Sequence, residues 1–234
     1  MYIPQFIKKR LKQREMLRFY RQFIKAGDLC FDIGANSGER TDVFLKLNVK
    51  VICVEPQSKC VNVLEEKYKN NSNVTLVHAA LGSSEGEAEL MLCEETDECS
   101  TLSPDFVKTY TGVSSFHWNK KEKVNVLTLD SLCASYGMPK LCKIDVEGFE
   151  SEVFKGMTKD IEIICFEFNY PLITDTIKSL ETLEVLRNYE CNYIEYERMD
   201  LILDKWMGIK EFKEKVKELV EPSVLTGEIV VRRT

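Results

Sequence analysis

The sequence predicts an α/β protein built on a doubly wound, mostly parallel sheet with an antiparallel edge. Two observations carry this prediction. Short apolar runs alternate with stretches of helical periodicity, and a glycine loop directly follows the first of these runs. Strands joined through helices form right-handed crossovers, and ligands bind beyond the carboxyl ends of such strands. With 234 residues, of which 44% are hydrophobic, we expect one domain over residues 28–234, preceded by an arm over residues 1–27.

The arm differs in charge from the rest of the chain. It contains eight basic residues and one acid and so carries +7, which leaves −13 on the remainder for a net charge of −6. Apolar residues recur at helical spacing between the basic ones, which predicts a basic amphipathic helix. We favour a helix packed on the domain with its basic face in solvent. The alternative is contact with an anionic membrane or an acidic substrate. The apolar residues are Phe6, Ile7, Leu11, Leu17, Tyr20, Phe23 and Ile24.

The first predicted strand runs into a glycine loop within the segment DLCFDIGANSGERT. Its apolar run is typical of a central strand buried on both faces, and Asp32 lies inside it. A buried carboxylate needs hydrogen-bond donors around it, so Asp32 is a candidate functional residue. Gly34 allows a sharp turn or the close approach of a ligand. Asn36 followed by Glu39 resembles a capping box and predicts the start of a helix.

Strands and helices then alternate along the chain. A polar segment, residues 94–122, interrupts the alternation and contains the aromatic cluster around His117. A long loop in a compact domain usually carries function, so this segment is interpreted either as a lid or as a loosely packed insertion. The predicted strands are 29–33, 49–56, 73–81, 88–93, 124–129, 161–171, 191–197 and 228–233; the predicted helices are 39–47, 58–69, 174–188 and 209–220; and 140–157 is a strand, glycine turn and helix.

Polar side chains mark the ends of two of the later strands. Period-two alternation places Lys143 and Asp145 on one side of their strand, with Asp145 at its carboxyl end. Glu167 and Asn169 share a face in the same way on the next strand. Strand ends of this kind converge at the ligand-binding edge of a doubly wound sheet.

The glycine loop bears on the choice of cofactor. A dinucleotide fingerprint has glycines at three places where this chain has Gly34, Asn36 and Glu39, so the pattern fails twice. A carboxylate in the first helical turn also disfavours a pyrophosphate. A ligand with one carboxylate and a cationic centre, such as S-adenosylmethionine, fits better. Glu55, at the end of the second strand, is placed for ribose hydroxyls and would serve either cofactor.

Six motifs taken together resemble the FkbM family of S-adenosylmethionine-dependent methyltransferases. The match spans roughly residues 27–168. Its motifs are DIGANSGERT, VEP (Val54–Pro56), HAALGSSEGEAEL (His78–Leu90), STL (Ser100–Leu102), VLTLDSL (Val126–Leu132) and KIDVEGFESEVFKG (Lys143–Gly156).

This resemblance implies a Rossmann-like class I methyltransferase fold and O-methylation of a hydroxyl on a sugar, glycan or small-molecule acceptor. It also implies a cofactor site whose methionine end lies at the glycine loop, whose ribose end lies at the second strand and whose adenine end lies near Ala80. The residues implied are Asp32, Gly34, Ala35, Asn36 and Gly38 for the methionine end, and Glu55, Pro56 and Ala80 for the nucleoside.

Methyl transfer to an alcohol needs a group that takes the hydroxyl proton. Asp145, placed by the resemblance at the reaction centre, is the first candidate. Lys143 could orient the acceptor or could form a structural ion pair with Asp145, and His117 is the third candidate. A metal alternative uses Asp145, Glu167 and Asn169 as oxygen ligands of Mg²⁺, although such strand ends also occur without a metal, and we favour the metal-free interpretation.

Other features bear on compartment and partners. Nine cysteines with no CxxC pair favour a reducing cytosol, so a cytoplasmic protein is predicted, with peripheral membrane contact through the arm as the alternative. No apolar run approaches membrane-spanning length. A body of charge −13 disfavours nucleic acid as substrate. An NAD-type oxidoreductase and a non-catalytic cofactor-binding module remain the competing functions. The sequence does not determine the oligomeric state.

Overall fold

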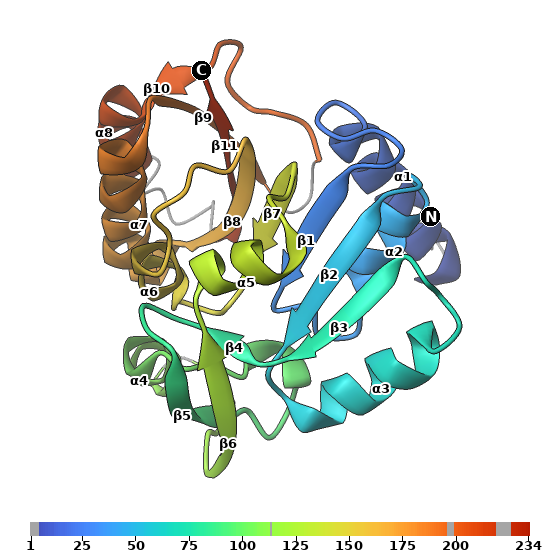
Figure 1. Ribbon diagram of the computed structural model, residues 1–234. Coiled ribbons are helices and arrows are strands. Elements are labelled where there is room, and N and C mark those ends of the chain that lie inside the picture. The colour runs from blue at the N-terminus through green and yellow to red at the C-terminus, as the bar shows by residue number, and fades with distance from the viewer. Residues whose placement is uncertain (1–4, 113, 196–198, 219–225) are drawn as a thin grey trace.

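The computed structural model describes residues 5–112, 114–195, 199–218 and 226–234, and it confirms the doubly wound α/β fold (Figure 1). Residues 1–4 of the predicted arm, residue 113 of the polar segment, residues 196–197 of one predicted strand and residues 219–220 of the last predicted helix lie outside the described residues. Eight strands form one sheet in the order β10-β9-β11-β8-β7-β1-β2-β3, and three form a smaller sheet in the order β4-β6-β5.

The elements agree with the prediction in kind over most of the chain. The strands are β1 (Leu29–Ile33), β2 (Lys50–Glu55), β3 (Val74–His78), β4 (Ala80–Leu81), β5 (Gly86–Leu92), β6 (Lys120–Leu127), β7 (Leu141–Ile144), β8 (Ile163–Asn169), β9 (Tyr189–Glu195), β10 (Met207–Gly208) and β11 (Thr226–Arg233). The helices are α1 (Gln5–Tyr20), α2 (Glu39–Leu45), α3 (Ser58–Tyr68), α4 (Pro104–Thr111), α5 (Leu129–Tyr136), α6 (Glu150–Lys155), α7 (Ile173–Leu186) and α8 (Ile209–Glu218), with 3₁₀ turns at Asp97–Cys99 and Tyr170–Leu172.

Helices cover both faces of the large sheet (Figure 1). α5, α6, α7 and α8 enclose one apolar core, and α1, α2 and α3 enclose the other. Because side chains alternate along a strand, Phe31 and Ile33 belong to the first core and Cys30 to the second. The parallel strands are therefore apolar on both sides, as the continuous apolar runs predict. All nine cysteines carry free thiols, and eight of them are buried.

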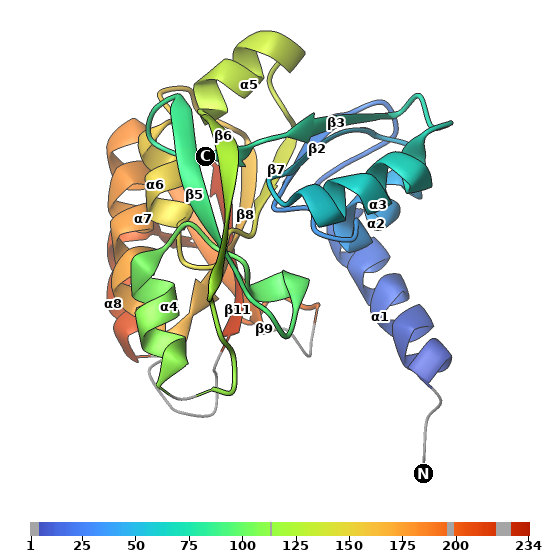
Figure 2. The same ribbon diagram turned by 90° about the horizontal axis from the view of Figure 1, so that it is seen from below.

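The N-terminal arm packs its second half into this second core. Met16, Phe19 and Tyr20 are fully buried. Tyr20 meets Phe44 of α2 edge to face, with ring centroids 4.9 Å apart. The first half of α1 projects away from the body of the protein (Figure 2). The C-terminal half of the arm is thus packed on the domain, and its N-terminal half is exposed.

Several local predictions are wrong. The N-cap of α2 is Gly38, in a left-handed conformation and with no side-chain cap, so Asn36 and Glu39 do not form a capping box. The predicted strand 73–81 is divided between β3 of the large sheet and β4 of the small one. α5 was not expected, and the polar segment 94–122 contains α4. By contrast, the predicted antiparallel edge is confirmed, with β11 paired to both β8 and β9.

Candidate active site

The candidate site is a cleft at the carboxyl ends of β1, β2 and β7, with a volume of about 760 Å³. β1 and β7 are neighbours in the sheet although far apart in sequence, so the cleft lies where the strand order reverses, the usual ligand position in such sheets. Gly34 is required by the crossing of the two loops there. A β-carbon at this position would lie 1.8 Å from the carbonyl oxygen of Asp145, and φ is +75°. The glycine therefore brings β1 and β7 together at the base of the cleft.

Sheet register places the predicted polar residues on one face. Asp32 is the direct partner of Lys143 in the pairing of β1 with β7. Both residues are buried on the face covered by α1 and α2. The Asp32 carboxylate accepts a hydrogen bond of 2.5 Å from the Thr41 hydroxyl. Burial raises the pKa of Asp32, while Thr41 and the Lys143 charge act in the opposite direction. The buried Asp32 thus receives a hydrogen-bond donor from α2 and a nearby positive charge from β7.

Glu55 ends β2 at the rim of the cleft. Its two carboxylate oxygens accept hydrogen bonds from the backbone amides of Asn36, at 2.7 Å, and Gln57, at 2.8 Å. Burial raises the pKa of Glu55 to about 7, against the effect of these two amides. Each oxygen retains a second lone pair, so the carboxylate can still accept hydrogen bonds from ribose hydroxyls.

The amides of the glycine loop do not form an open anion site. Those of Gly34 and Ala35 donate to the carbonyl oxygen of Val54, that of Asn36 donates to Glu55, and that of Gly38 donates to the Ala35 carbonyl. A carboxylate group on a ligand would therefore need other donors than these four amides. The loop shapes the cleft wall through its close packing.

The charge of the cleft lining favours a cationic ligand. Nine acidic and four basic residues line it. Opposite charges attract strongly where water is partly excluded, so a sulfonium or ammonium group is favoured and a pyrophosphate is opposed. The acidic residues are Asp32, Glu39, Asp42, Glu55, Asp97, Glu98, Asp145, Glu147 and Glu167; the basic residues are Lys12, Arg40, Lys67 and Lys143.

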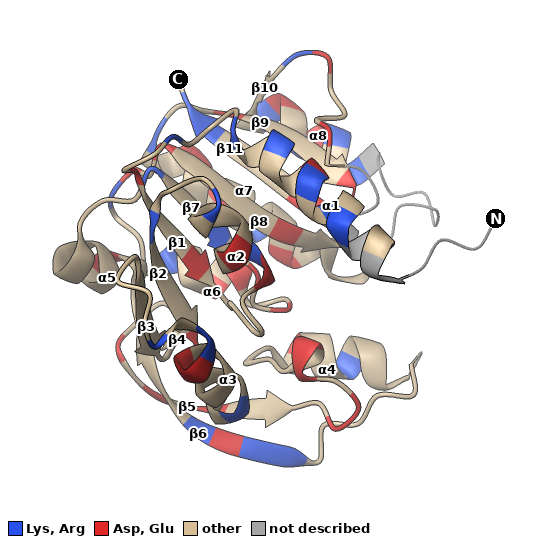
Figure 3. Ribbon diagram, turned by 90° about the vertical axis from the view of Figure 1, so that its right-hand side faces the viewer, with Lys and Arg blue, Asp and Glu red and all other residues tan. Residues whose placement is uncertain are grey.

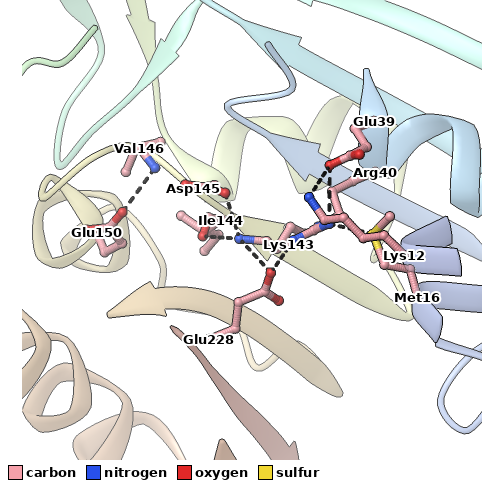
Figure 4. A network of polar contacts seen from close by, with 10 residues as sticks. All are labelled: Lys12, Met16, Glu39, Arg40, Lys143, Ile144, Asp145, Val146, Glu150 and Glu228. Carbon is pink, nitrogen blue, oxygen red and sulfur yellow. Dashed lines mark hydrogen bonds and ion pairs between the residues drawn. The ribbon is translucent and has the colours of Figure 1, made fainter. Parts of the chain in front are cut away.

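An ion-pair network connects residues of the cleft lining with Glu228 (Figure 4). Lys143, with no solvent exposure, places its ammonium nitrogen 3.1 Å from Asp145 Oδ2 and 3.6 Å from Glu228 Oε1. Arg40 of α2 contacts the same Glu228 oxygen at 2.6 Å. Although burial acts to lower it, the pKa of Lys143 is raised overall by the charges of Asp145 and Glu228. Lys143 therefore remains charged inside the protein.

Three carboxylates meet at the base of the cleft. Asp145, Glu147 and Glu167 each offer an oxygen within 4.8 Å of the others. The Lys143 ammonium nitrogen lies 3.1 Å from Asp145 Oδ2 beside this cluster. Against the effect of burial, the Lys143 charge lowers the pKa of Asp145, whereas burial and neighbouring acids raise the pKa of Glu147 and Glu167. Asp145 is thus the ionised member of the cluster, and the same oxygens could instead hold a divalent cation.

The structure separates two predicted residues from this cluster. The Asn169 side-chain oxygen accepts a hydrogen bond of 2.5 Å from the Tyr110 hydroxyl, and Asn169 does not line the cleft. The carboxylate that lies beside Asp145 and Glu167 is that of Glu147, whereas the sequence predicted Asn169 as the third possible metal ligand. His117 also lies outside the cleft lining; its exposed ring pairs with Glu95 at 2.7 Å. The catalytic role predicted for His117 thus has no support from its position.

The remaining predicted cofactor residues lie along the cleft, except Gly38. Ala35, Asn36, Pro56 and Ala80 all line it. Gly38 instead begins α2, where its carbonyl oxygen accepts a hydrogen bond of 3.0 Å from the Tyr68 hydroxyl. Gly38 therefore joins the glycine loop to α3 through this hydrogen bond.

Part of the polar segment 94–122 belongs to the cleft wall. Thr101 is buried and donates a hydrogen bond of 2.8 Å to the carbonyl oxygen of Glu147. Asp97, Glu98 and Ser100 line the cleft as well. This first portion of the segment is therefore tied to the loop that carries the carboxylates.

Sequence reasoning missed four residues of the site: Arg40, Thr41, Glu147 and Glu228. Glu228 had a visible signal, because an acid within the apolar run of β11 is costly to bury without a cation. Glu147 lies in a glycine turn with φ of +54°, a conformation that sequence does not reveal for glutamate. Arg40 and Thr41 follow the glycine loop at helical positions that look ordinary in sequence.

Comparisons with known proteins show the family and the fold of the chain. A family model described as "Methyltransferase FkbM domain" matches residues 32–195. Comparison with curated protein sequences gives no match. Among solved structures, the precorrin-6Y C5,15-methyltransferase of Geobacter metallireducens has 13% identity and a TM-score of 0.50, covering 95% of this chain and 87% of that one.

Two further solved structures resemble the chain. A putative O-methyltransferase from Klebsiella pneumoniae has 8% identity and a TM-score of 0.51, covering 100% of this chain and 82% of that one. A TehB-like SAM-dependent methyltransferase from Corynebacterium glutamicum has 8% identity and a TM-score of 0.50, covering 94% and 88%. At these identities the likeness shows the fold, which is that of class I methyltransferases.

Proposed function

Because the chain belongs to the FkbM methyltransferase domain family and has the fold of S-adenosylmethionine-dependent methyltransferases, we propose that it methylates a hydroxyl oxygen of a sugar, glycan or other small-molecule acceptor. The observation that carries this proposal is the position of Asp145. Its carboxylate is kept ionised by buried Lys143 at one end of an acidic cleft, and Glu55 marks the other end.

The cleft residues fit S-adenosylmethionine. Glu55 would hold the ribose hydroxyls, Ala80 would flank the adenine, and the acids around Asp32 would face the amino group. When bound, the cofactor supplies an electrophilic methyl carbon attached to a positively charged sulfur. The excess of acids in the lining opposes the diphosphate of NAD, the runner-up cofactor.

Asp145 acts on the acceptor hydroxyl in this proposal. Its carboxylate accepts the hydroxyl hydrogen bond and fixes the oxygen in line for methylation. As the new carbon–oxygen bond forms, the oxygen becomes strongly acidic, so even a carboxylate of lowered pKa can take its proton. Lys143 keeps Asp145 ionised before the transfer. Glu167, whose carboxylate lies within 4.8 Å of that of Asp145, completes the polar end of the pocket.

Cofactor identity is tested by thermal unfolding. S-adenosylmethionine and its product S-adenosylhomocysteine should raise the melting temperature, and NAD should leave it unchanged. A ligand stabilises the native state only if it binds that state. Native mass spectrometry of the purified protein should also detect bound S-adenosylhomocysteine. If NAD raised the melting temperature and S-adenosylmethionine and S-adenosylhomocysteine did not, the result would favour an oxidoreductase.

Two variants separate catalysis from cofactor binding. Asp145→Asn should lower kcat by about 10²–10⁴-fold, the contribution typical of a general base, while the thermal shift with S-adenosylhomocysteine persists. Glu55→Gln should weaken that shift, because one oxygen that accepts hydrogen bonds is replaced by a donor group. Full activity of Asp145→Asn would remove this residue from the reaction.

The role of a metal is tested with a chelator. We propose that the carboxylate cluster works without a cation, because the Lys143 ammonium at 3.1 Å already compensates the charge of Asp145, and chelation should leave activity unchanged. Loss of activity restored by Mg²⁺ would instead assign Asp145, Glu147 and Glu167 as its ligands.

A further inference from the structure

The outer face of α1 carries one continuous stripe of residues opposite its packed side. Positions 7, 10, 11, 14 and 18 recur at intervals of three and four, so their side chains share one face of the helix, and Arg21 follows in the turn directly after it. Met16, Phe19 and Tyr20 occupy the opposite face and are buried. We call the outer face the arginine stripe; its members are Ile7, Arg10, Leu11, Arg14, Arg18 and Arg21.

The charge of the arginine stripe is largely uncompensated. Arg18 pairs with Asp200 at 2.7 Å. Arg10, Arg14 and Arg21 are exposed and form no ion pair within the described part of the chain. Figure 3 shows several basic residues along α1. Three arginine side chains are therefore available to an anionic partner.

Aliphatic side chains lie among these arginines. Ile7 and Leu11 are 38% and 45% exposed, and together with Arg10, Arg14, Leu17 and Lys46 they line a shallow groove. Exposed aliphatic groups among guanidinium groups allow one surface to combine burial of apolar area with attraction to anionic lipid, the two contributions that set the strength of interfacial binding. None of the described helices combines the length with the hydropathy that a membrane span requires.

We propose that the arginine stripe docks the protein on a membrane rich in anionic phospholipid, with the arginines on headgroup phosphates and Ile7 and Leu11 among the upper acyl chains. This goes beyond the methyl transfer proposed above and does not depend on it. Nucleic acid would bind the arginines but gain little from the aliphatic pair. A second copy of the helix would place its own arginines against the arginines of the stripe, and the like charges would repel.

The cleft lies beside the docked helix. Lys12 and Gln13, on the inner side of α1, line the cleft. Lys12 pairs with Glu39 of α2 at 3.0 Å. Docking through the stripe would therefore hold the cleft close to the membrane surface, within reach of an acceptor displayed there.

Vesicle sedimentation of the full chain tests the proposal. Vesicles of phosphatidylcholine mixed with phosphatidylserine should sediment the protein at low salt, pure phosphatidylcholine should not, and high salt should weaken binding because it screens the charges. Arg10→Gln/Arg14→Gln should lower the affinity about 30-fold, at about 1 kcal/mol per basic residue near an anionic surface. Ile7→Ser/Leu11→Ser should also lower it, with the salt dependence retained.

A matched control removes the same charge elsewhere. Lys178→Gln/Lys210→Gln neutralises exposed lysines of α7 and α8, on the opposite side of the molecule, and should leave vesicle binding unchanged (Figure 1). Thermal unfolding should show that all three double variants fold. The proposal would be overturned if the control variant lost vesicle binding equally, or if the protein bound RNA in preference to the vesicles. It would also be overturned if analytical ultracentrifugation showed a dimer that Arg10→Gln/Arg14→Gln alters.

Discussion

Charged side chains occupy opposite environments at the base of the cleft and on the arginine stripe. Lys143 and Glu228 are fully buried, and each has an oppositely charged neighbour within 4 Å. Arg10 and Arg14 are exposed and unpaired within the described residues. Burying a charge costs several kcal/mol unless an opposite charge lies beside it, whereas an exposed charge costs little wherever it lies. Ion pairing therefore accounts for the charged residues at the cleft. No such pairing in the described part of the chain accounts for Arg10 and Arg14, whose place in the stripe is evident only from the spacing of the residues along α1.

The largest effect is expected from removing the buried cation. Lys143→Met leaves the fully buried Glu228 and the partly exposed Asp145 without their ammonium neighbour, and should lower the free energy of unfolding by about 3–5 kcal/mol, measured by urea denaturation. The pKa of Asp145 should rise, because Lys143 is the main charge that lowers it. Lys143→Met/Glu228→Gln, which also removes a buried negative charge, should recover part of the loss. A single variant as stable as the wild type would show that the network is not needed for folding.

A smaller effect is expected from a buried acid with no cation beside it. Glu150 accepts the Val146 amide at 3.0 Å, and burial together with the Asp175 charge raises its pKa from 4.5 to about 8. The folded state thus holds this proton more tightly than the unfolded state, so stability falls as pH rises through that interval, by at most about 1.4 kcal/mol per pH unit.

Glu150→Gln should flatten this decline, since the amide oxygen can still accept the Val146 hydrogen bond. Denaturation midpoints taken across the same interval provide the measurement. The decline should not vanish, because Glu55 has a raised pKa and acts in the same direction. An unchanged slope in the variant would show that Glu150 does not titrate there.

The smallest effect is expected at an exposed ion pair. Lys121 of β6 contacts Glu89 of β5 at 2.7 Å, and both side chains are more than half exposed. Lys121→Ala should change the free energy of unfolding by less than about 1 kcal/mol, because water and salt screen such pairs. A loss comparable with that of Lys143→Met would erase the contrast between buried and exposed charges.

Much of the candidate site could be predicted because it depends on local pattern. Period-two alternation placed Lys143 and Asp145 on one face, and the structure joins them by an ion pair of 3.1 Å. The same rule placed Glu167 and Asn169 together, yet Asn169 turns to Tyr110 of the polar segment. A face is a local property, whereas the partner of a side chain depends on what packs above it.

By itself the sequence determined the alternation of strands and helices, the buried Asp32 and the amphipathic arm, because these follow from periodicity and from the cost of burying polar groups. Only the tertiary structure decided that β11 lies between β8 and β9, which brings Glu228 to Lys143. Sheet order is set by long-range packing, and residues separated by 85 positions or more meet only when the whole sheet has formed.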